Sequence, residues 1–405
     1  MNILVISQYY YPEQFRINDI CEELVKKGNM VTVLSGIPNY PLGEIYDGYE
    51  NSHKNLEVKN GVRIIRCNNR PRHRGIINLI LNYLSYVRCS NKIIKNMREK
   101  FDIVYVYELS PITMAIPAII YKKKTGTPLY LYCLDLWPES IREISNDRLL
   151  STHNPIYLIT KIVSQKIYNS ADCVGIKCRE FSDYLINVCK VNPNKIKLLY
   201  EHAEDSYLQI GEKTSNEKCY NFMFLGNIGI AQNCEILLKA VSALETKINF
   251  KLHFVGDGSD LENLKNKTKE FKLEDKVVFH GRQPVSEVNK YYAMADCCLL
   301  TLSNNTACGL TLPAKLTGYM ASGRPIIAAA DGATKSIIGE ADCGICISPK
   351  DVDGIRVAMQ YALENQVEFR NKGLNGREYF KTHFTLEDHI KNLLEQFEEL
   401  REESV

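Results

Sequence analysis

The stretch that decides the fold is LLTLSNNTACGLTLPAKLTGYMASGRPIIAAA, Leu299–Ala330. It starts as a short apolar run, passes through a polar loop, continues with a helical pattern and ends in a second apolar run. Short apolar runs are typical of strands buried on both faces of a parallel sheet. Pro313 suits the first turn of the helix, where its missing N–H costs nothing, and Thr311 is placed to cap that turn. The stretch therefore predicts a strand–helix–strand unit.

The same alternation runs along the rest of the chain. NILVIS (Asn2–Ser7) and MVTVLSG (Met30–Gly36) are predicted strands, and the amphipathic segment between them ends at Gly28, a suitable helix C-cap. Further predicted strands have the sequences GVRIIRC, DIVYVYE, PLYLYCLD, ADCVGIK, NFMFLGN, KLHFVGDG, KVVFHG, CCLLTL, RPIIAA and CGICIS. Strands that alternate with helices in this way favour parallel α/β sheets.

The polar stretch Glu204–Lys218 is the predicted joint between two series of these units. We therefore expect an α/β protein with two doubly wound Rossmann-like domains, at residues 1–205 and 206–380, that face a central cleft. Residues 381–405 are predicted to form a C-terminal helix that packs back toward the N-terminal domain. Ligands of open α/β sheets bind beyond the carboxyl ends of the strands, so site residues are expected at those ends.

Composition excludes several classes of protein. The 405 residues are 45% hydrophobic and 24% charged, and the net charge of +2 gives no bulk attraction for nucleic acid. No basic platform with interleaved aromatic residues is evident, so no nucleic-acid partner is expected. The fourteen cysteines include no two CxxC motifs at zinc spacing, and MNILVISQYY is not a signal peptide. We expect reduced cytosolic thiols that serve as small hydrophobic side chains.

Glycine-containing turns follow several predicted strands of the second half. Gly226 and Gly229 lie in FLGNIGIAQN, Gly256 in FVGDG and Gly281 in FHGRQP. Glycines let the backbone pass close to a ligand and helix N-termini attract phosphate, although strand-to-helix turns need glycine for the fold alone. Lys315 is a stronger signal, because the helix dipole disfavours a cation in the first turn unless an anion binds there. The alternative is an exposed lysine on an ordinary helix.

Polar residues also follow predicted strands of the first half. LYCLDLWPES ends a strand with Asp135, and Glu139 follows it closely. A carboxylate at a strand end can orient or deprotonate a substrate, so both are predicted catalytic residues; a helix cap or turn is the alternative for Asp135. Trp137 can stack on a sugar, although filling a core is the commoner role. The acceptor side is assigned Trp137 and three residues that follow the first two strands: Arg16, Asn39 and Tyr40.

The order of motifs in the second half resembles a known family. GNIGIAQ, HFVGDGSDLENLK, VVFHGRQPVSEVNKYYAMADCCLLTL, LPAKLTGYMASGRPIIAAADG and CGICISPKD look like the donor-binding domain of GT-B glycosyltransferases, specifically the retaining enzymes of family 4. In the first half, QYYYPEQFRINDICEELVKKGNMVTVLSGIPNYPLGEIYDGY, DLWPES and AED are similar to the subgroup that builds bacterial surface polysaccharides such as capsule and O-antigen, including N-acetyl-fucosamine transferases. The resemblance runs nearly from end to end.

The resemblance implies roles for individual residues of the donor side. Arg282, after Gly281, would contact the nucleobase, and the loop Gly226–Gly229 would lie near the diphosphate. Backbone N–H groups from Leu312 and the ammonium of Lys315 would bind the phosphates. The donor side thus comprises Gly226, Asn227, Gly229, Gly256, Gly281, Arg282, Thr311, Leu312 and Lys315.

Two departures from the family pattern concern the same helix and loop. The family usually carries two glutamates eight positions apart that contact the donor sugar and the ribose, and here Leu310 and Gly318 occupy those places. The family also often has a basic pair where Asn227 and Gln232 stand. These departures make Lys315 the main expected cation on the diphosphate, and they keep an inactive homologue open as an interpretation.

A basic segment in the first half suggests a membrane surface. Between Asn60 and Arg98 there is no acidic residue, and nine basic residues flank the apolar IINLILNYLSYV: Arg63, Arg66, Arg70, Arg72, Arg74, Arg88, Lys92, Lys95 and Arg98. This pattern is typical of a helix that binds in the interface of an anionic membrane, and Lys122–Lys124 add to it. The alternative is a solvated charged face over a core helix.

The function predicted from these features is a retaining glycosyltransferase of bacterial surface polysaccharide biosynthesis. It would move a sugar from a nucleotide donor, most simply a UDP-sugar, to a polyprenyl-diphosphate-linked or saccharide acceptor at the inner face of the membrane. The family favours a front-face displacement, so we expect no cofactor and no metal; DVD at Asp351–Asp353 is better explained by helix capping. The alternatives are a nucleotide-sugar epimerase of the same architecture and an inactive sugar-binding homologue.

Overall fold

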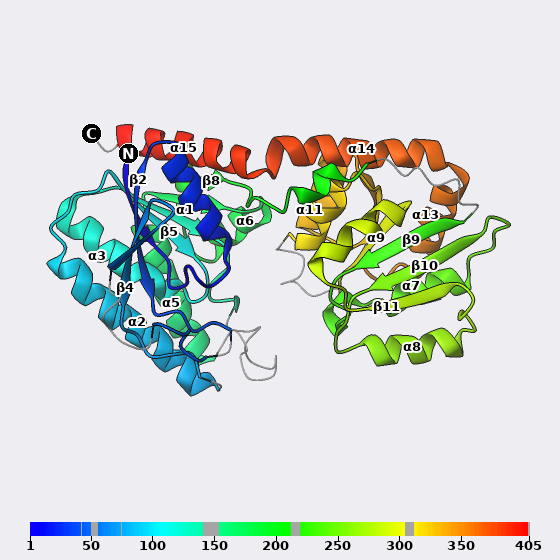
Figure 1. The fold of residues 1–405 in the computed structure, drawn as a ribbon, viewed down its shortest axis with the longest axis horizontal. Coiled ribbons are helices and arrows are strands. Elements are labelled where there is room, and N and C mark those ends of the chain that lie inside the picture. The colour runs from blue at the N-terminus through cyan, green and yellow to red at the C-terminus, as the bar shows by residue number, and fades with distance from the viewer. Residues whose placement is uncertain are drawn as a thin grey trace. The chain divides into compact units, whose positions relative to one another are not determined.

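A computed structural model describes residues 1–41, 43–49, 56–73, 75–140, 154–211, 219–303 and 312–403 of the chain. The chain divides into two compact units, which are considered separately (Figure 1). Unit 1 comprises Met1–Tyr200 and His389–Val405, and unit 2 comprises Glu201–Asp388. The predicted boundaries at 205/206 and 380/381 thus differ from the observed ones by a few residues. The last helix belongs to unit 1.

Unit 1 is built on an eight-stranded sheet with the strand order β3-β4-β2-β1-β5-β6-β7-β8. Its strands are β1 (Asn2–Ile6), β2 (Met30–Gly36), β3 (Leu56–Lys59), β4 (Val62–Cys67), β5 (Ile103–Glu108), β6 (Leu129–Cys133), β7 (Cys173–Ile176) and β8 (Ile196–Leu198). All pair in parallel except the edge strand β3, which pairs antiparallel with β4. The central strands are almost wholly buried because helices cover both faces of the sheet.

Helices cover the two faces of the unit 1 sheet as a doubly wound fold requires. In Figure 1, α1 (Arg16–Lys26) and α15 (Leu386–Glu402) lie on one face, while α2 (Ile76–Asn96), α3 (Ile116–Thr125) and α5 (Pro155–Ser170) lie on the other. The short helix α6 is Glu180–Asn187. As predicted, α1 is followed by Gly28, whose φ of 85° ends the helix.

Unit 2 is built on a six-stranded parallel sheet with the order β11-β10-β9-β12-β13-β14. Its strands are β9 (Tyr220–Leu225), β10 (Phe250–Val255), β11 (Val277–Gly281), β12 (Cys297–Thr301), β13 (Ile326–Ala329) and β14 (Gly344–Ile347). Its α-helices are α7 (Glu235–Ser242), α8 (Leu261–Glu270), α9 (Val288–Met294), α11 (Ala314–Ala321), α12 (Ala333–Glu340), α13 (Val352–Glu364) and α14 (Gln366–His383). Its core joins Phe222 and Phe224 of β9 to apolar residues of α7 and α13.

Candidate active site

The carboxyl ends of β5 and β6 bring two carboxyl groups together in unit 1. Asp135 follows β6 and is half-buried, and its Oδ2 accepts a 2.7 Å hydrogen bond from the Ser110 hydroxyl. Glu108, the last residue of β5, is fully buried, and neither of its carboxyl oxygens has a well-formed hydrogen bond within the described residues. Burial, and then the negative charge of Asp135, raise the pKa of Glu108 well above its ordinary value. Burial of Glu108 next to the Asp135 carboxyl group thus favours the protonated form of Glu108.

Glu139 and Trp137 pack into the protein beside Asp135. Glu139 Oε1 accepts hydrogen bonds from Tyr157 of α5 at 2.6 Å and from Tyr184 of α6 at 3.1 Å, so this carboxylate ties two helices together. Trp137 is only 5% exposed, and its backbone N–H donates to the Tyr168 hydroxyl. The contacts of Glu139 and the burial of Trp137 are those of residues that hold the fold, and their catalytic and acceptor roles stay predictions.

A buried glutamate that sequence reasoning missed organises the predicted acceptor loop. Glu13 is 2% exposed, and its Oε1 accepts backbone hydrogen bonds from Asn39 at 2.8 Å and Tyr40 at 2.7 Å. The Asn39 amide is occupied inside the fold, because its Oδ1 accepts from the Arg72 backbone N–H and its Nδ2 donates to the Ile37 carbonyl. Asn39 thus shapes the loop.

Tyr40 offers an accessible aromatic face at the same edge of the sheet. Its side chain is 37% exposed, and it packs with Tyr9 and Phe15 at ring-centroid distances of about 5.5 Å. Arg72 lies over the Tyr40 ring, 5.5 Å from its centroid. Arg16 is the first residue of α1 and is half-buried next to this cluster in the sequence. Of the predicted acceptor residues, Tyr40 is the one with a face available for stacking.

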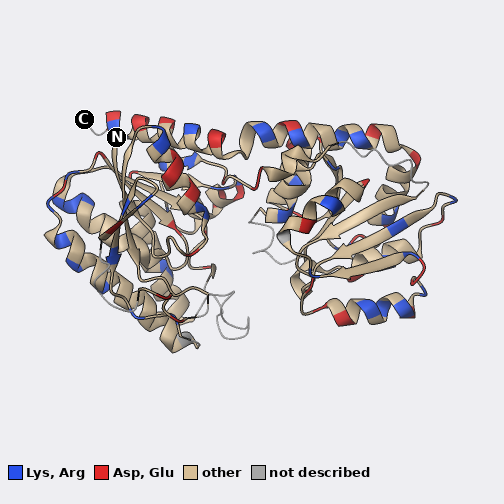
Figure 2. Ribbon diagram, viewed as in Figure 1, with Lys and Arg blue, Asp and Glu red and all other residues tan. Residues whose placement is uncertain are grey.

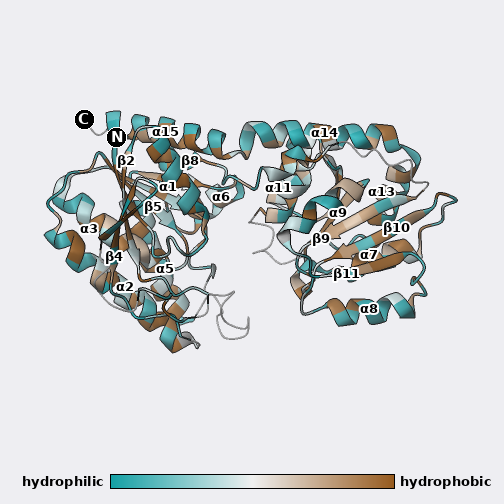
Figure 3. Cartoon of the chain, viewed as in Figure 1, coloured by the Kyte–Doolittle hydropathy of each residue, from teal (hydrophilic) through white to brown (hydrophobic). Residues whose placement is uncertain are grey.

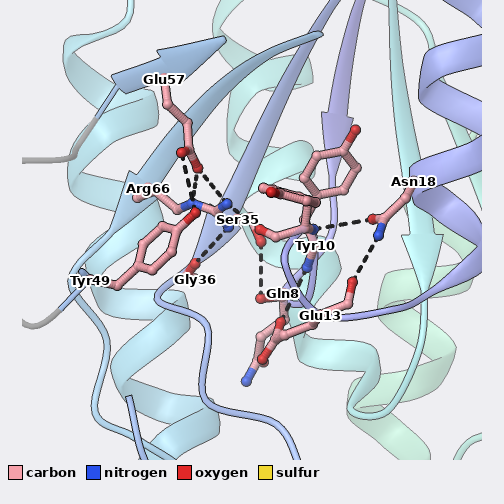
Figure 4. Close-up of polar contacts among 10 residues, drawn as sticks. Gln8, Tyr10, Glu13, Asn18, Ser35, Gly36, Tyr49, Glu57 and Arg66 are labelled. Atoms are coloured by element: carbon pink, nitrogen blue, oxygen red, sulfur yellow. Dashed lines mark hydrogen bonds and ion pairs between the residues drawn. The ribbon is translucent and has the colours of Figure 1, made fainter. Parts of the chain in front are cut away.

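A buried arginine of unit 1, Arg66, forms an ion pair with Glu57 (Figure 4). Arg66 of β4 is 3% exposed, and its Nη2 lies 2.5 Å from Glu57 Oε1. The same guanidinium donates to the backbone carbonyls of Tyr11 and Gly36 and lies over the Tyr49 ring. The charge of Arg66 is therefore compensated within the protein by a carboxylate, two backbone carbonyls and an aromatic ring.

The turns after β9 and β10 of unit 2 press against each other. Gly226 follows β9 with φ 120°, and Gly256 follows β10 with φ 149°. A Cβ atom on Gly256 would lie 1.9 Å from the Gly226 carbonyl oxygen. The close approach of the two backbones thus requires glycine at 256 whether or not a ligand binds. This agrees with the alternative that the turns need glycine for the fold alone.

Asn227 and Gln232, which stand where the resembling family has basic residues, bond to each other. Gln232 Oε1 accepts hydrogen bonds from Asn227 Nδ2 at 3.0 Å and from the Gly229 backbone N–H at 3.1 Å. The buried Thr301 hydroxyl at the end of β12 donates to the Gln232 carbonyl at 2.5 Å. These bonds fix the loop after β9 against the end of β12.

Lys315 projects from the first turn of α11 toward this loop. Its ammonium has no exposed surface and no hydrogen-bond partner among the described residues, although the residue as a whole is half-buried. The Nζ atom lies 4.0 Å from the centroid of the Phe224 ring and beside Gly226. Burial lowers the pKa of Lys315 to about 8, against a small opposing effect of Cys234. Lys315 is therefore a buried cation that has no anionic partner among the described residues.

The start of α11 differs from the prediction by one position. Pro313 is the N-cap residue and precedes the helix, with its carbonyl accepting from Leu316 N, so it is not in the first turn. Its ψ of 135° is extended, and a residue with that conformation lies outside the helix. Leu312 is half-buried just before it, whereas the predicted cap Thr311 and Leu310 lie outside the described residues.

Gly318 has a packing reason to be glycine. A Cβ atom there would lie 2.6 Å from the Tyr292 hydroxyl and 3.6 Å from the Tyr207 ring. Tyr292 of α9 is 4% exposed and packs on Tyr207 with ring centroids 4.8 Å apart. Two tyrosines thus fill the space into which a side chain at 318 would extend. The glutamate of the resembling family does not fit this packing.

β11 ends at Gly281, with φ 68°, and the exposed Arg282 follows it. Two histidines that the sequence analysis passed over precede it in the sheet: His253 Nδ1 and His280 Nε2 are 3.0 Å apart, and their rings stack. In the described residues no group of three or more His, Cys, Asp or Glu side chains is arranged to hold a metal.

Residues 208–378 match the family model described as "Glycosyl transferases group 1". We call the matched residues the group 1 domain; they coincide with most of unit 2 and contain Lys315 and the loop Gly226–Gly229.

Curated relatives match only part of the chain. It is 27% identical over 196 residues to N-acetyl-alpha-D-glucosaminyl L-malate synthase of Bacillus anthracis, covering 46% of this chain and 50% of that protein. It is 32% identical over 161 residues to alpha-monoglucosyldiacylglycerol synthase of Streptococcus pneumoniae (strain ATCC BAA-255 / R6), covering 36% and 34%. The matched segments thus span half or less of each relative.

Solved structures match the fold over nearly the whole chain. The sucrose-phosphate synthase of Thermosynechococcus elongatus superposes with a TM-score of 0.70 at 16% identity, covering 98% of each chain. Anabaena HepE in complex with UDP superposes with a TM-score of 0.70 at 14% identity, covering 98% of this chain and 100% of the other. The group 1 domain and unit 1 together therefore have the GT-B architecture of two parallel-sheet Rossmann-like domains, as the sequence predicted.

Proposed function

We propose that the protein is a retaining glycosyltransferase that moves a sugar from a UDP-sugar to a polyprenyl-diphosphate-linked or saccharide acceptor. Its place would be bacterial surface polysaccharide biosynthesis at the inner face of the membrane. The group 1 domain and the GT-B architecture support sugar transfer. The observation that carries the proposal is the buried ammonium of Lys315, which has no partner among the described residues.

Lys315 has the properties of a residue that binds phosphate. A cation in the first turn of a helix opposes the helix dipole, and burial without a counter-charge adds a desolvation penalty. A diphosphate at the N-terminal end of α11 reverses both effects, since the free N–H groups and the ammonium then bind negative charge. Diphosphate binding would therefore explain why the free protein keeps a buried cation that is unpaired within the described residues and destabilises its fold.

The transfer itself needs positioning and charge stabilisation. In the proposed front-face displacement, the bond between the sugar carbon and the diphosphate oxygen breaks, and the acceptor hydroxyl bonds to the carbon on the same face. The hydroxyl proton passes to the departing diphosphate oxygen. Lys315 would stabilise the charge that develops on the diphosphate, and Asp135 would orient the reacting groups.

The lipid part of the proposal is supported by apolar residues on the surface of unit 1. Large exposed side chains occupy the first turns of two helices: Ile77, Ile80, Leu81 and Leu84 on α2, and Ile156, Leu158, Ile159 and Ile162 on α5. Ile77 is 71% exposed and Ile159 is 62% exposed. Both helices pack against the short helix η1 (Ile112–Ala115), and Figure 3 shows apolar residues at the start of α2. We call these eight side chains the apolar face.

The charges around the apolar face favour an anionic membrane over a protein partner. Neither α2, α3 nor α5 contains an acidic residue, and basic residues are spread along them (Figure 2). Lys122 pairs with Asp172, and Lys124 donates to backbone carbonyls, so the attraction would come mainly from α2 and α5. In the described residues, no helix is long and apolar enough to cross a membrane. Peripheral binding through the apolar face is therefore proposed.

Sedimentation with vesicles tests the lipid part. Wild-type protein should sediment with vesicles that contain anionic phosphatidylglycerol and much less with neutral phosphatidylcholine vesicles. Ile80→Glu together with Ile159→Glu should reduce sedimentation about tenfold or more. Val367→Glu is the matched control, because Val367 is 75% exposed on α14 of unit 2. Equal loss in the control, or no loss in the double variant, would contradict membrane binding by the apolar face.

A product assay tests the activity. Purified protein is incubated with a panel of UDP-sugars, with and without a polyprenyl-diphosphate-linked acceptor, and products are followed by mass spectrometry. Release of UDP that depends on acceptor, with a retained anomeric configuration, is the expected result. Epimer formation without acceptor would favour the epimerase alternative, and absence of nucleotide-sugar binding would favour an inactive homologue.

A further inference from the structure

Two thiols from different elements of unit 1 lie together at a pocket that the proposed transfer does not use. Cys67 is the last residue of β4 and is 1% exposed, while Cys89 is half-buried in the middle of α2. Both residues pack in one cluster with Tyr86 and Met114. Both also line a pocket of about 610 Å³. Cys89 is thus accessible from the pocket, and the buried Cys67 lies next to it.

The pocket is electropositive. Its charged lining residues are Arg63 and Arg66 of β4, Lys92 of α2, and Arg98 and Glu99 of the segment after α2. Glu99 pairs with Arg63 at 2.8 Å, and Arg66 pairs with Glu57 outside the lining. Lys92 and Arg98 have no ion pair within the described residues. A negative group in this pocket is therefore favoured.

Cys89 is the described thiol that this environment activates. The Cys67 thiol donates a hydrogen bond to it, and with the Asn68 backbone N–H and the charge of Lys92 it lowers the pKa of Cys89 to about 7 against the effect of burial. The lowered pKa favours the Cys89 thiolate, and the thiolate is the reactive form. Every other described cysteine with a shifted pKa is shifted upward, with burial as the largest cause.

We propose that Cys89 and Cys67 form a peroxide-sensitive thiol pair that closes reversibly to a disulfide between α2 and β4. The features are those of a redox-sensing cysteine: an accessible sulfur in a basic pocket, with a second thiol in contact to resolve the oxidised form. The CGIC sequence at Cys343–Cys346 looks like a better candidate, yet Cys343 precedes β14, whereas Cys346 lies within the strand, and residues three apart along extended backbone point to opposite faces.

The reaction balances with hydrogen peroxide as the oxidant. The Cys89 thiolate attacks one peroxide oxygen, the O–O bond breaks, and hydroxide leaves and is protonated to water. The sulfenic acid of Cys89 is then attacked by the Cys67 sulfur, which loses its proton. The S–S bond forms, the S–O bond breaks, and a second water is released. Peroxide is reduced by two electrons and the two thiols are oxidised; a dithiol reductant reverses the step.

Alkylation kinetics on the full-length protein test the activated thiol. Iodoacetamide at neutral pH should label Cys89 about tenfold faster than Cys346, a half-buried thiol whose pKa is raised to about 11. The labelling rate of Cys89 should have its pH midpoint near 7, and Lys92→Gln should move that midpoint upward. Equal labelling of Cys89 and Cys346, or a midpoint above about 8.5, would overturn the proposal.

Peptide mapping after peroxide treatment tests the pair. The expected product is a Cys67–Cys89 cross-linked peptide that is two hydrogens lighter and disappears with dithiothreitol. Cys67→Ser should instead leave Cys89 as a sulfenic acid that reacts with dimedone; near-UV circular dichroism establishes that this variant folds, and Cys67→Ala serves if it does not. Sulfinic Cys89 without any cross-link in the wild-type protein would overturn the proposal.

Discussion

Each unit contains a buried cation, and the two cations differ in how their charge is compensated. Arg66 in unit 1 is 3% exposed and has a carboxylate partner, Glu57, together with two backbone carbonyls. Lys315 in unit 2 has a buried ammonium that contacts the face of Phe224 but has no hydrogen-bond partner among the described residues. A buried charge is stable only when it is paired. The fold supplies the pair for Arg66, and we expect the substrate to supply it for Lys315.

We interpret Arg66 as a structural cation and propose a functional role for Lys315. Arg66 joins β4 to the loops after β1 and β2, so its bonds hold the edge of the sheet where the acceptor loop begins. Burial lowers the pKa of Lys315 to about 8. Four changes test the comparison, from the largest expected effect to the smallest.

Arg66→Met should cause the largest loss of stability. It leaves Glu57 without its partner and two backbone carbonyls without a donor, which costs about 3–5 kcal/mol. Urea unfolding followed by circular dichroism measures the loss. The matched variant Arg63→Met removes an exposed pair with Glu99 and should cost less than about 1 kcal/mol. Equal losses in the two variants would mean that Arg66 is not the structural cation described here.

Asp135→Asn should lower kcat about 100-fold with stability nearly unchanged, because a half-buried carboxylate that orients reacting groups is lost. Glu108→Gln should keep kcat within a few-fold, since the raised pKa of Glu108 favours the protonated acid, which glutamine resembles in size and charge. Steady-state kinetics on both variants decide the roles. A large loss in Glu108→Gln would show that the ionised form of Glu108 is needed, in conflict with its burial.

Lys315→Met should stabilise the free protein by about 2 kcal/mol at neutral pH, because it removes a buried charge and keeps the volume. The sign follows from the depressed pKa. The unfolded chain binds the lysine proton more tightly, so the penalty is complete below pH 8 and fades as pH rises toward the ordinary value of 10.5. Urea midpoints of wild type and variant should therefore converge between those values. A variant less stable than wild type at neutral pH would contradict an unpaired Lys315.

Gly318→Ala should give the smallest effect, a destabilisation of about 1–2 kcal/mol, because the new methyl group meets the Tyr292 hydroxyl. Gly339→Ala is the matched control in α12, where no atom lies within 4 Å of the new Cβ, and it should stabilise by about 0.5–1 kcal/mol. Adding Tyr292→Phe to Gly318→Ala should recover part of the loss. Stabilisation by Gly318→Ala alone would refute the packing explanation.

Much of the fold was predictable because buried parallel strands have a strong sequence signal. MVTVLSG is a continuous apolar run and forms β2 with the predicted bounds, Met30–Gly36. The strands missed were β3 and β8, with the sequences LEVK and IKL. Both lie at the edges of the unit 1 sheet, where one side is open and the strands are short and polar.

The site was less predictable, because partners depend on distances that a sequence does not contain. Lys315 was found from its place in a helical turn, yet its burial against Phe224 needed the structure. From the sequence, Gly318 was interpreted as the loss of a glutamate that contacts the ribose. The structure shows that a side chain at 318 would meet Tyr292, which lies on another helix. Glu108 and Glu13 were missed, because a carboxylate at the end of a strand or in a loop gives no sign that it is buried.

Nucleotide titration calorimetry at neutral pH tests the central claim most directly. Wild-type protein, Lys315→Met and the exposed control Lys269→Met are each titrated with UDP and with uridine. We expect that Lys315→Met binds UDP about 100-fold more weakly than wild type, that its uridine affinity is unchanged, and that Lys269→Met resembles wild type for both. Unchanged UDP affinity in Lys315→Met, or an equal loss for uridine, would contradict a diphosphate bound by Lys315.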